Sequence, residues 1–144
     1  MGPGWNYVPR AYTLHANSCE PSPVYSMAAT KTDPSELLPL TPVAFDILLA
    51  LLEGEAHGYA IMQSVQGRTG GATSLHAGTL YRALSRLVDA ELIEELDELP
   101  AHASDERRRY YRVTGLGRRV AAAEARRLES QLGAARAHGL LGST

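Results

Sequence analysis

The order of the periodic segments that begin at Thr41 is the feature that most constrains the fold of this chain. Three successive segments carry apolar residues at spacings of three and four, the pattern typical of amphipathic helices. A pair of strand-like segments follows, and then one more helical segment. Three helices followed by a two-stranded hairpin is the plan of a helix-turn-helix domain with a wing. The pattern therefore predicts a mainly α protein with a small β-hairpin: a winged helix-turn-helix with an added C-terminal dimerisation helix.

The first helix has clear start and stop signals. Thr41 is a good N-cap residue, and Pro42 suits the first helical position because an N–H there would have no partner. Glu53-Gly54 ends the segment with a residue that readily adopts the left-handed conformation. The side chains expected to face the core are Val43, Ala44, Ile47, Leu48, Leu51 and Leu52.

Two further helices are expected over residues 57–67 and 77–90, joined by a loop over residues 67–74 that contains the pair Gly70-Gly71. The first of these helices should bury Tyr59, Met62 and either Ile61 or Val65. The second should bury Leu80, Leu84, Leu87 and Val88, and its opposite stripe consists of Thr79, Arg82, Ala83 and Arg86.

The hairpin brings four arginines together. Its strands are expected over residues 92–97 and 107–113, with a polar loop between them in which His102 should be exposed rather than a ligand. Strand alternation would place Arg108 and Arg112 on one face, and Arg107 and Arg109 on the other face beside Tyr111 and Val113. We expect at least one arginine to pair across the hairpin with an acidic residue of the first strand, namely Glu94, Glu95 or Asp97.

The last helix, expected over residues 116–138 after the capping residue Thr114, offers a surface for a partner. Gly117 stands where a capping box would have Glu, so this helix start should be weak. A narrow seam with heptad-like spacing consists of Ala121, Ala125, Leu128, Leu132 and Ala135. One domain of this size has little to cover such a seam, so we expect a second copy of the chain to cover it. The alternative is that the helix folds back on its own domain.

Residues 1–39 differ from the rest of the chain. They hold six of the eight prolines and show no helical or strand period, so we expect a disordered leader. The winged helix-turn-helix then covers residues 40–114, the dimerisation helix residues 115–138, and a tail residues 139–144. Met27 opens the segment MAATKTDPSELLPLT, an ordinary start, which suggests that residues 1–26 come from a mis-assigned upstream start. Neither a secretion signal nor an apolar run of ~18 residues is present, so we expect a cytoplasmic protein without a membrane span.

Charge is divided unevenly along the chain. Residues 1–104 contain five basic and twelve acidic residues, a net charge of −7, whereas residues 105–144 contain nine and four, a net charge of +5. Local field matters more than the total charge of −2 for the attraction of phosphate. The wing residues Arg107, Arg108 and Arg109 are therefore expected to hold DNA phosphates or to enter the minor groove.

The third helix is expected to read the bases of duplex DNA, because the second helix of a helix-turn-helix enters the major groove. Arg82 and Arg86 lie one turn apart, and the arginine fork can donate to both O6 and N7 of guanine. Thr79 and Tyr81 offer hydroxyl groups to phosphates or bases, and Gly78 lets the backbone approach closely. The alternatives are that the two arginines form a solvated face and that Tyr81 packs its ring against the edge of the core.

Three segments, in this order, resemble the PadR family of transcriptional regulators. They are LTPVAFDILLALLEGEAHGYAIMQSV, GTLYRALSRLVDAELIEE and DERRRYYRVTGLGRR, and together they cover about Leu40 to Arg119. The resemblance implies a homodimeric winged-helix repressor whose C-terminal helix completes the dimer. It also implies binding to a palindromic operator, with release when a small, often aromatic, effector binds.

The resemblance also implies roles for single residues. By this resemblance, the residues that contact DNA are Tyr59, Thr79, Tyr81, Arg82 and the wing arginines. For Tyr59, a contact with DNA is incompatible with the inward packing expected above. The chain departs from the family pattern at Glu91, where the family usually has Gly, so the turn there should be altered. The only Trp, Trp5, lies in the leader and cannot line an effector pocket of the folded part.

Other function classes are disfavoured by the residues. The five histidines lack metal-type spacing, Cys19 is the sole cysteine, and no Gly-rich phosphate loop follows a strand. We therefore expect no enzyme activity, no cofactor and no metal site. The alternative function is a winged-helix interaction adaptor without sequence-specific DNA binding, since the acidic residues of segment 89–98 would suit a basic protein.

Overall fold

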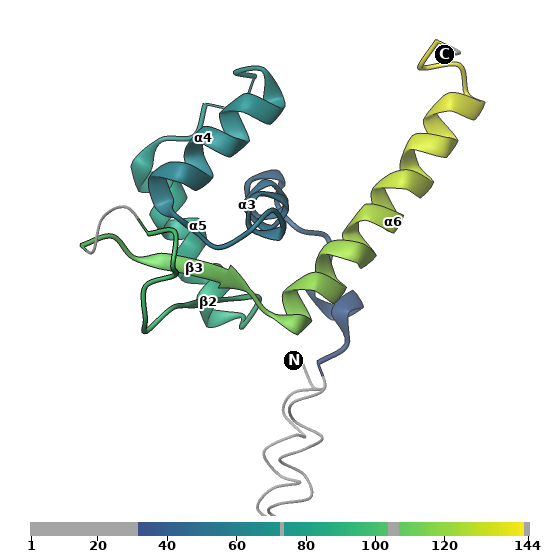
Figure 1. Ribbon diagram of the computed structural model, residues 1–144. Coiled ribbons are helices and arrows are strands. Elements are labelled where there is room, and N and C mark those ends of the chain that lie inside the picture. Colours follow the sequence, from purple (N-terminus) through teal and green to yellow (C-terminus); the bar gives the residue numbers. More distant parts are fainter. Residues whose placement is uncertain (1–31, 73, 104–106, 143–144) are drawn as a thin grey trace, which may run out of the picture. The chain divides into compact units, whose positions relative to one another are not determined.

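The computed structural model describes residues 32–72, 74–103 and 107–142. The chain divides into two units, Met1–Asp33 and Pro34–Thr144, and the architecture below is that of the second. Within the described residues there are four α-helices and a small antiparallel sheet, which confirms the predicted fold class. Figure 1 shows α3 between the pair α4 and α5 on one side and α6 on the other. The elements in chain order are η1 (Pro34–Leu37), α3 (Pro42–Leu52), β1 (Ala56–His57), α4 (Gly58–Thr69), α5 (Ala77–Asp89), β2 (Ile93–Glu95), β3 (Tyr110–Val113) and α6 (Gly115–Ala137).

The folded unit begins before residue 40. Residues Pro34–Leu37 form the short 3-10 helix η1, and Leu37 and Leu38 pack against the hydrophobic core. The sequence pattern placed these residues in the leader because a four-residue helix is too short to show a period. Residues 1–31 of the predicted leader, with Trp5, Cys19 and Met27, lie outside the described residues.

Helix α3 has the predicted cap. The Oγ1 atom of Thr41 accepts a hydrogen bond from the backbone N–H of Ala44 at 3.2 Å, and Pro42 is the first helical residue. Of the expected inward positions, Ile47, Leu48 and Leu51 are buried, Val43 and Ala44 are half-buried against the core, and Leu52 is exposed. The buried side chains of α3 are Ile47, Leu48, Ala50 and Leu51.

Helix α4 is longer than predicted and is rotated relative to the prediction. It continues through Gly67 and ends at Gly70, which takes the left-handed conformation with φ 61°. Ile61 and Val65 are both fully buried, whereas Tyr59 is 52% exposed. The prediction that Tyr59 faces inward is therefore wrong. Two residues turn a helix by about 200°, so a face centred on Ile61 points Tyr59 to the opposite side.

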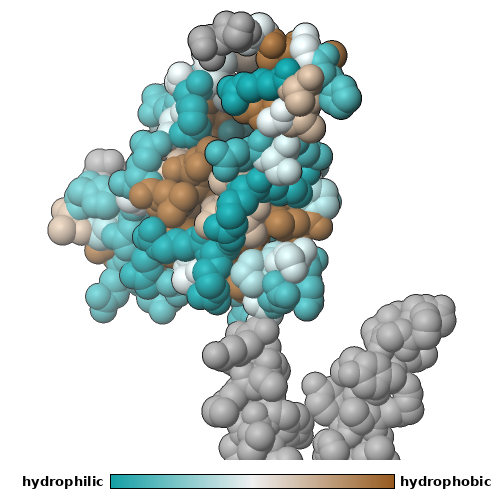
Figure 2. Space-filling view, turned by 90° about the vertical axis from the view of Figure 1, so that its right-hand side faces the viewer, coloured by the Kyte–Doolittle hydropathy of each residue, from teal (hydrophilic) through white to brown (hydrophobic). Residues whose placement is uncertain are grey.

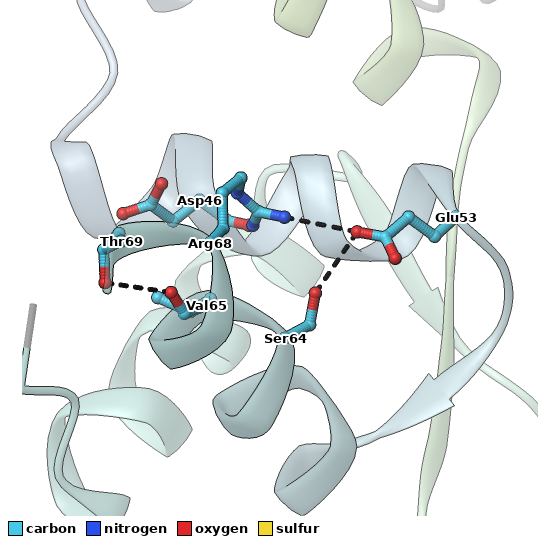
Figure 3. A network of polar contacts seen from close by, with 6 residues as sticks. All are labelled: Asp46, Glu53, Ser64, Val65, Arg68 and Thr69. Atoms are coloured by element: carbon cyan, nitrogen blue, oxygen red, sulfur yellow. Dashed lines mark hydrogen bonds and ion pairs between the residues drawn. The ribbon is translucent and has the colours of Figure 1, made fainter. Parts of the chain in front are cut away.

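A polar network joins α3 to α4 (Figure 3). The Glu53 carboxylate accepts hydrogen bonds from the Ser64 hydroxyl and from the Arg68 guanidinium, each at 3.2 Å. The other terminal nitrogen of Arg68 donates to the backbone oxygen of Asp46 at 2.9 Å. Arg68 thus bonds to α3 at Asp46 and to the residue that ends the helix, Glu53, and so ties α4 to α3.

Helix α5 buries the predicted leucines and ends in a Schellman turn. Glu91 follows the helix with φ 61°, and the N–H of Leu92 returns to the backbone oxygen of Leu87 at 2.9 Å. A glutamate thus occupies a backbone conformation that favours glycine. The turn expected to be altered at Glu91 keeps the glycine-type geometry. The buried side chains of α5 are Leu80, Leu84 and Leu87.

The sheet has three strands in the order β1-β3-β2, so the predicted two-stranded hairpin is incomplete. Strand β1 has two residues and pairs with β3 through Ala56 and His57, a length that shows no period in the sequence. Strand β3 begins at Tyr110 rather than at residue 107, so the predicted alternation does not extend to the preceding arginines. Within β3, Tyr110 and Tyr111 are successive residues on opposite faces of the sheet, and both are buried. Tyr111 belongs to the hydrophobic core, whereas the ring of Tyr110 meets the rings of His57 and His102 edge-on.

The start of α6 is held tightly against the sheet. The Thr114 hydroxyl oxygen accepts from the Gly117 N–H at 2.9 Å, which confirms Thr114 as the cap. A Cβ atom at Gly117 would overlap the backbone oxygen of Leu92. Gly117 is therefore explained by close packing against β2, and the start that was expected to be weak is firmly anchored.

The second half of α6 projects away from the domain (Figure 1). Ala121, at the base of the predicted seam, is buried in the core of its own chain. Further along, Leu128 is 38% and Leu132 40% exposed, and Ala125 is exposed as well. Figure 2, which views the molecule from the side on which α6 lies in Figure 1, shows apolar areas on a largely hydrophilic face. The predicted seam therefore begins in the core and continues onto free surface.

Candidate nucleic-acid interface

The predicted outer face of α5 is exposed except at Ala83, which packs partly against the hydrophobic core, so that position was assigned wrongly. Gly78, Thr79, Tyr81, Arg82 and Arg86 are all exposed, and Tyr81 is 54% accessible, so its ring does not pack against the core edge as one alternative held. Among the described residues, neither Arg82 nor Arg86 has a side-chain partner for a hydrogen bond or ion pair. Both guanidinium groups are therefore available to a ligand in the folded chain.

A cleft of about 530 Å³ lies beside this face. Three segments meet there: the start of α4, the first half of α5 and the residues that precede β3. Five of the nine residues predicted to contact DNA line this cleft, so residues that are far apart in sequence form one surface. The lining residues are His57, Gly58, Tyr59, Tyr81, Arg107, Arg108 and Arg109.

His57 organises the α4 side of the cleft. Its Nδ1 atom accepts a hydrogen bond from the backbone N–H of Ala60 at 3.1 Å and so caps α4. The guanidinium of Arg108 lies 3.3 Å from the same Nδ1 atom and 5.8 Å from the ring centroid of Tyr59. The His57 ring also meets the ring of Tyr110 edge-on, with centroids 5.2 Å apart. Arg108 is thus held over two aromatic side chains at the start of a helix.

The electrostatic character of the cleft favours anions. The start of a helix carries partial positive charge, and the first turn of α4 contains no acidic residue. Three arginines line the same cleft, and none of the described residues that line it carries a carboxylate. The hydroxyl groups of Tyr59 and Tyr81 add neutral hydrogen-bond donors. A phosphate oxygen is the type of group that this combination attracts.

The other wing arginines are engaged across the hairpin, which confirms the expected cross-strand pairing. Arg112 donates to Glu94 at 2.9 Å and lies 3.6 Å from Glu55, while Arg109 lies 3.6 Å from Glu95. These pairs are exposed and each contributes little stability. They do direct the side chains: Arg112 is turned along the sheet and away from the cleft lining.

A second groove of about 250 Å³ runs between α5 and the wing. Arg109 lies in this groove, where it donates a hydrogen bond to the phenol of Tyr111. Burial raises the pKa of Tyr111 from its ordinary value of 10.0, and the nearby carboxylate of Glu95 acts in the same direction. The phenol therefore stays protonated at neutral pH. Arg109 is the arginine that links the cleft to the α5–wing groove.

Sequence reasoning missed the role of His57. The segment HGY drew attention to Tyr59, and His57 was placed inside the second helix rather than at its cap. The sequence did contain a signal for this cap: His57 directly precedes Gly58, the first helical residue, and a histidine ring nitrogen can accept a hydrogen bond from the first turn as a serine or threonine hydroxyl does. His102 is exposed as predicted, and its Nε2 atom lies 3.0 Å from the backbone oxygen of Glu55.

Within residues 32–72, 74–103 and 107–142, no group of three or more His, Cys, Asp or Glu side chains is arranged to hold a metal ion. In the same part of the chain, no helix is both long enough and apolar enough to traverse a lipid bilayer.

Comparison with known proteins points to one family. Residues 47–123, more than half of the chain, match the family described as "Transcriptional regulator PadR-like family". A curated relative, an uncharacterized protein of Lysinibacillus sphaericus, is 37% identical over 73 residues. That match covers 50% of this chain and 64% of the relative, so the chain spans less than two thirds of the relative's length.

Solved structures agree with the fold. A transcriptional regulator of Clostridium thermocellum is 27% identical with a TM-score of 0.56, over 65% of this chain and 86% of that one. RosR of H. salinarum is 28% identical with a TM-score of 0.50, and the match covers 67% of this chain and 78% of RosR. A PadR family regulator of Clostridium difficile R20291 is 23% identical with a TM-score of 0.58, and the match covers 68% of this chain and 98% of that one. At this identity the likeness supports the fold alone.

Proposed function

Because this chain belongs to the PadR-like family of transcriptional regulators, we propose that it is a repressor that binds duplex DNA as a homodimer on a palindromic operator. The observation that carries the proposal is the cleft in which the start of α4, Tyr81 of α5 and the wing arginines meet. Tyr81 of α5 lines this cleft and is next in sequence to Arg82, so we expect the phosphate-binding and base-reading groups to meet one ligand. Such a division of roles is usual for sequence-specific DNA binding.

The groups on this face fall into two functional sets. Arg82 and Arg86 lack protein partners among the described residues and can donate to base edges in the major groove, where a bidentate contact contributes about 1–3 kcal/mol of discrimination. Arg107, Arg108, Tyr59 and the start of α4 suit backbone phosphates. Gly78 and Thr79 lie at the first turn of α5, where the backbone can approach the duplex.

The homodimer is supported by the exposed part of α6. Leu128 and Leu132 are apolar, partly exposed, and one helical turn apart, and Ala125 continues the same seam. A two-fold dimer through this seam would present two DNA-binding faces, as a palindromic operator requires. Release of the operator by a small-molecule effector, and residence in the cytoplasm, complete the proposal.

A gel-shift salt series tests DNA binding. Promoter DNA from the gene's own neighbourhood should bind the full chain, and the logarithm of affinity should fall with the logarithm of salt by ~0.9 per neutralised phosphate. Absence of a shift at low salt would instead support the interaction adaptor. Genome-wide footprinting of bound DNA would then identify the regulated genes.

Two substitutions separate the roles of the arginines. Arg82→Ala should reduce the preference for the operator over random DNA, whereas Arg108→Ala should weaken both alike and lower the salt slope by about one. Arg112→Ala is the matched control, because its side chain is paired with Glu94 and Glu55. Equal loss on both DNAs for Arg82→Ala would contradict the base contact, and an unchanged slope for Arg108→Ala would contradict the phosphate contact.

A further inference from the structure

Glu124 of α6 is a buried carboxylate. It is 2% exposed, and among the described residues it is the sole charged side chain in the buried class. Both of its oxygens accept hydrogen bonds from Arg127, from Nε and from one terminal nitrogen, each at 2.7 Å. Burial of a charge is costly unless it is paired and hydrogen-bonded, so this arrangement is a specific structural device rather than an incidental surface pair.

The same carboxylate binds a second segment of the chain. The backbone N–H of Leu40 donates a hydrogen bond to Glu124. Leu40 follows η1, which packs against α6, and Leu37 and Leu38 lie against the core nearby. Glu124 therefore joins segment 34–40 to the base of α6, and Leu37 and Leu38 of that segment pack in turn against the core. We call this set of contacts the α6 clamp.

The α6 clamp lies where α6 leaves the domain. Up to Glu124 the helix has buried residues, whereas from Leu128 to Ala137 its side chains are exposed or, at Ala135, half-buried. These ten residues form an arm of about 15 Å, given a rise of 1.5 Å per residue. The family match ends at residue 123 and begins at residue 47, so both sides of the α6 clamp lie outside it.

We infer that Glu124 is a positioning residue that sets the direction of the α6 arm and thereby selects the spacing between the two half-sites of the operator. The inference rests on the proposed homodimer. A tilt of about 10° at the clamp would move the tip of a 15 Å arm by about 3 Å. One base pair advances the duplex by roughly 3.4 Å, so tilts of this size are enough to change the preferred half-site spacing.

The test uses the full chain and DNA duplexes that carry the operator selected by the wild-type protein. The spacing between half-sites is varied by one and two base pairs in either direction, and a duplex with a single half-site is included. Glu124→Gln removes the charge but keeps the shape. Glu129→Gln is the matched control, since Glu129 is an exposed glutamate on the same helix. A second variant, Glu124→Met with Arg127→Met, replaces the ion pair by apolar side chains, a change that folded proteins often tolerate.

The wild-type chain and Glu129→Gln should prefer one spacing by roughly tenfold over its neighbours, and both clamp variants should prefer it by less than about threefold. Affinity for the single half-site should stay the same in all four proteins. Spin labels on Gly67→Cys, in a Cys19→Ser background, should report a broader distance distribution across the dimer for the clamp variants.

Folded clamp variants with the wild-type spacing preference and the wild-type label distribution would overturn the inference and leave the proposed function intact. A wild-type chain that binds no duplex, or that remains a monomer, would overturn the proposed function, and the inference with it. The two failures are therefore distinguishable.

Discussion

The phenol of Tyr81 lies directly over Gly58. A Cβ atom at Gly58 would be 2.9 Å from the Tyr81 hydroxyl oxygen and 3.2 Å from the ring carbon that bears it. The absence of a side chain at the start of α4 therefore lets an α5 residue reach into the cleft. This contact joins the two helices of the helix-turn-helix at the surface proposed to bind DNA.

Gly58→Ala should displace Tyr81 and weaken DNA binding by roughly fivefold, the value of about one hydrogen bond to phosphate. Stability should change little, because Tyr81 is exposed and its ring can move. Gly67→Ala is the control: it makes the same substitution on the same helix, where an added Cβ meets nothing within 4 Å. If Gly58→Ala still weakens binding in a Tyr81→Phe background, the Tyr81 hydroxyl is not the group through which Gly58 acts.

Glu91→Gly should stabilise the protein. Glu91 has φ 61°, a conformation that costs a residue with a Cβ about 1–2 kcal/mol, part of which the greater freedom of glycine in the unfolded chain offsets. We expect a net gain of about 0.5–1 kcal/mol in the free energy of unfolding, measured by urea denaturation. Glu91→Ala separates the effect of backbone strain from the effect of the Glu91 charge, since alanine keeps the Cβ but removes the carboxylate. Equal stabilisation by both variants would mean that relief of charge repulsion, not backbone strain, is the cause.

Acid should weaken the α6 clamp. The hydrogen bonds from Arg127 lower the pKa of Glu124 from its ordinary value of 4.5, and burial opposes them only in part. A lowered pKa in the folded state contributes stability that is present above the unfolded-state value and is lost as the pH falls through the folded-state value. The stability advantage of wild type over Glu124→Gln should therefore shrink between pH 6 and pH 3. Denaturation at several pH values measures this; an advantage that is independent of pH would show that the charge of Glu124 is not what stabilises the clamp.

Local signals were enough to predict the four helices and the caps of α3 and α6, but not the cap of α4. Thr41 and Thr114 cap their helices as expected, and the leucine stripe of α5 is buried, because capping and amphipathic period depend on residues within one or two turns. The cross-strand pairing of the wing arginines was also predictable, since opposite charges face each other in a hairpin.

The candidate site could be predicted in residue type but not in arrangement. The exposure of Tyr59 depends on where α4 starts, and that is decided by the pairing of β1 with a strand more than fifty residues later. Arg112 lies outside the cleft lining because it pairs with Glu94 and Glu55, and Glu55 is not part of the hairpin.

The sequence by itself thus determined the order of the four helices and the hairpin, the buried stripe of α5 and the concentration of basic charge, since each follows from neighbouring residues. Only the tertiary structure decided the third strand, the glycine-type turn at Glu91, the contact between Tyr81 and Gly58, and the burial of Glu124. These features join segments distant in sequence, and their energies come from packing and desolvation that no local pattern records.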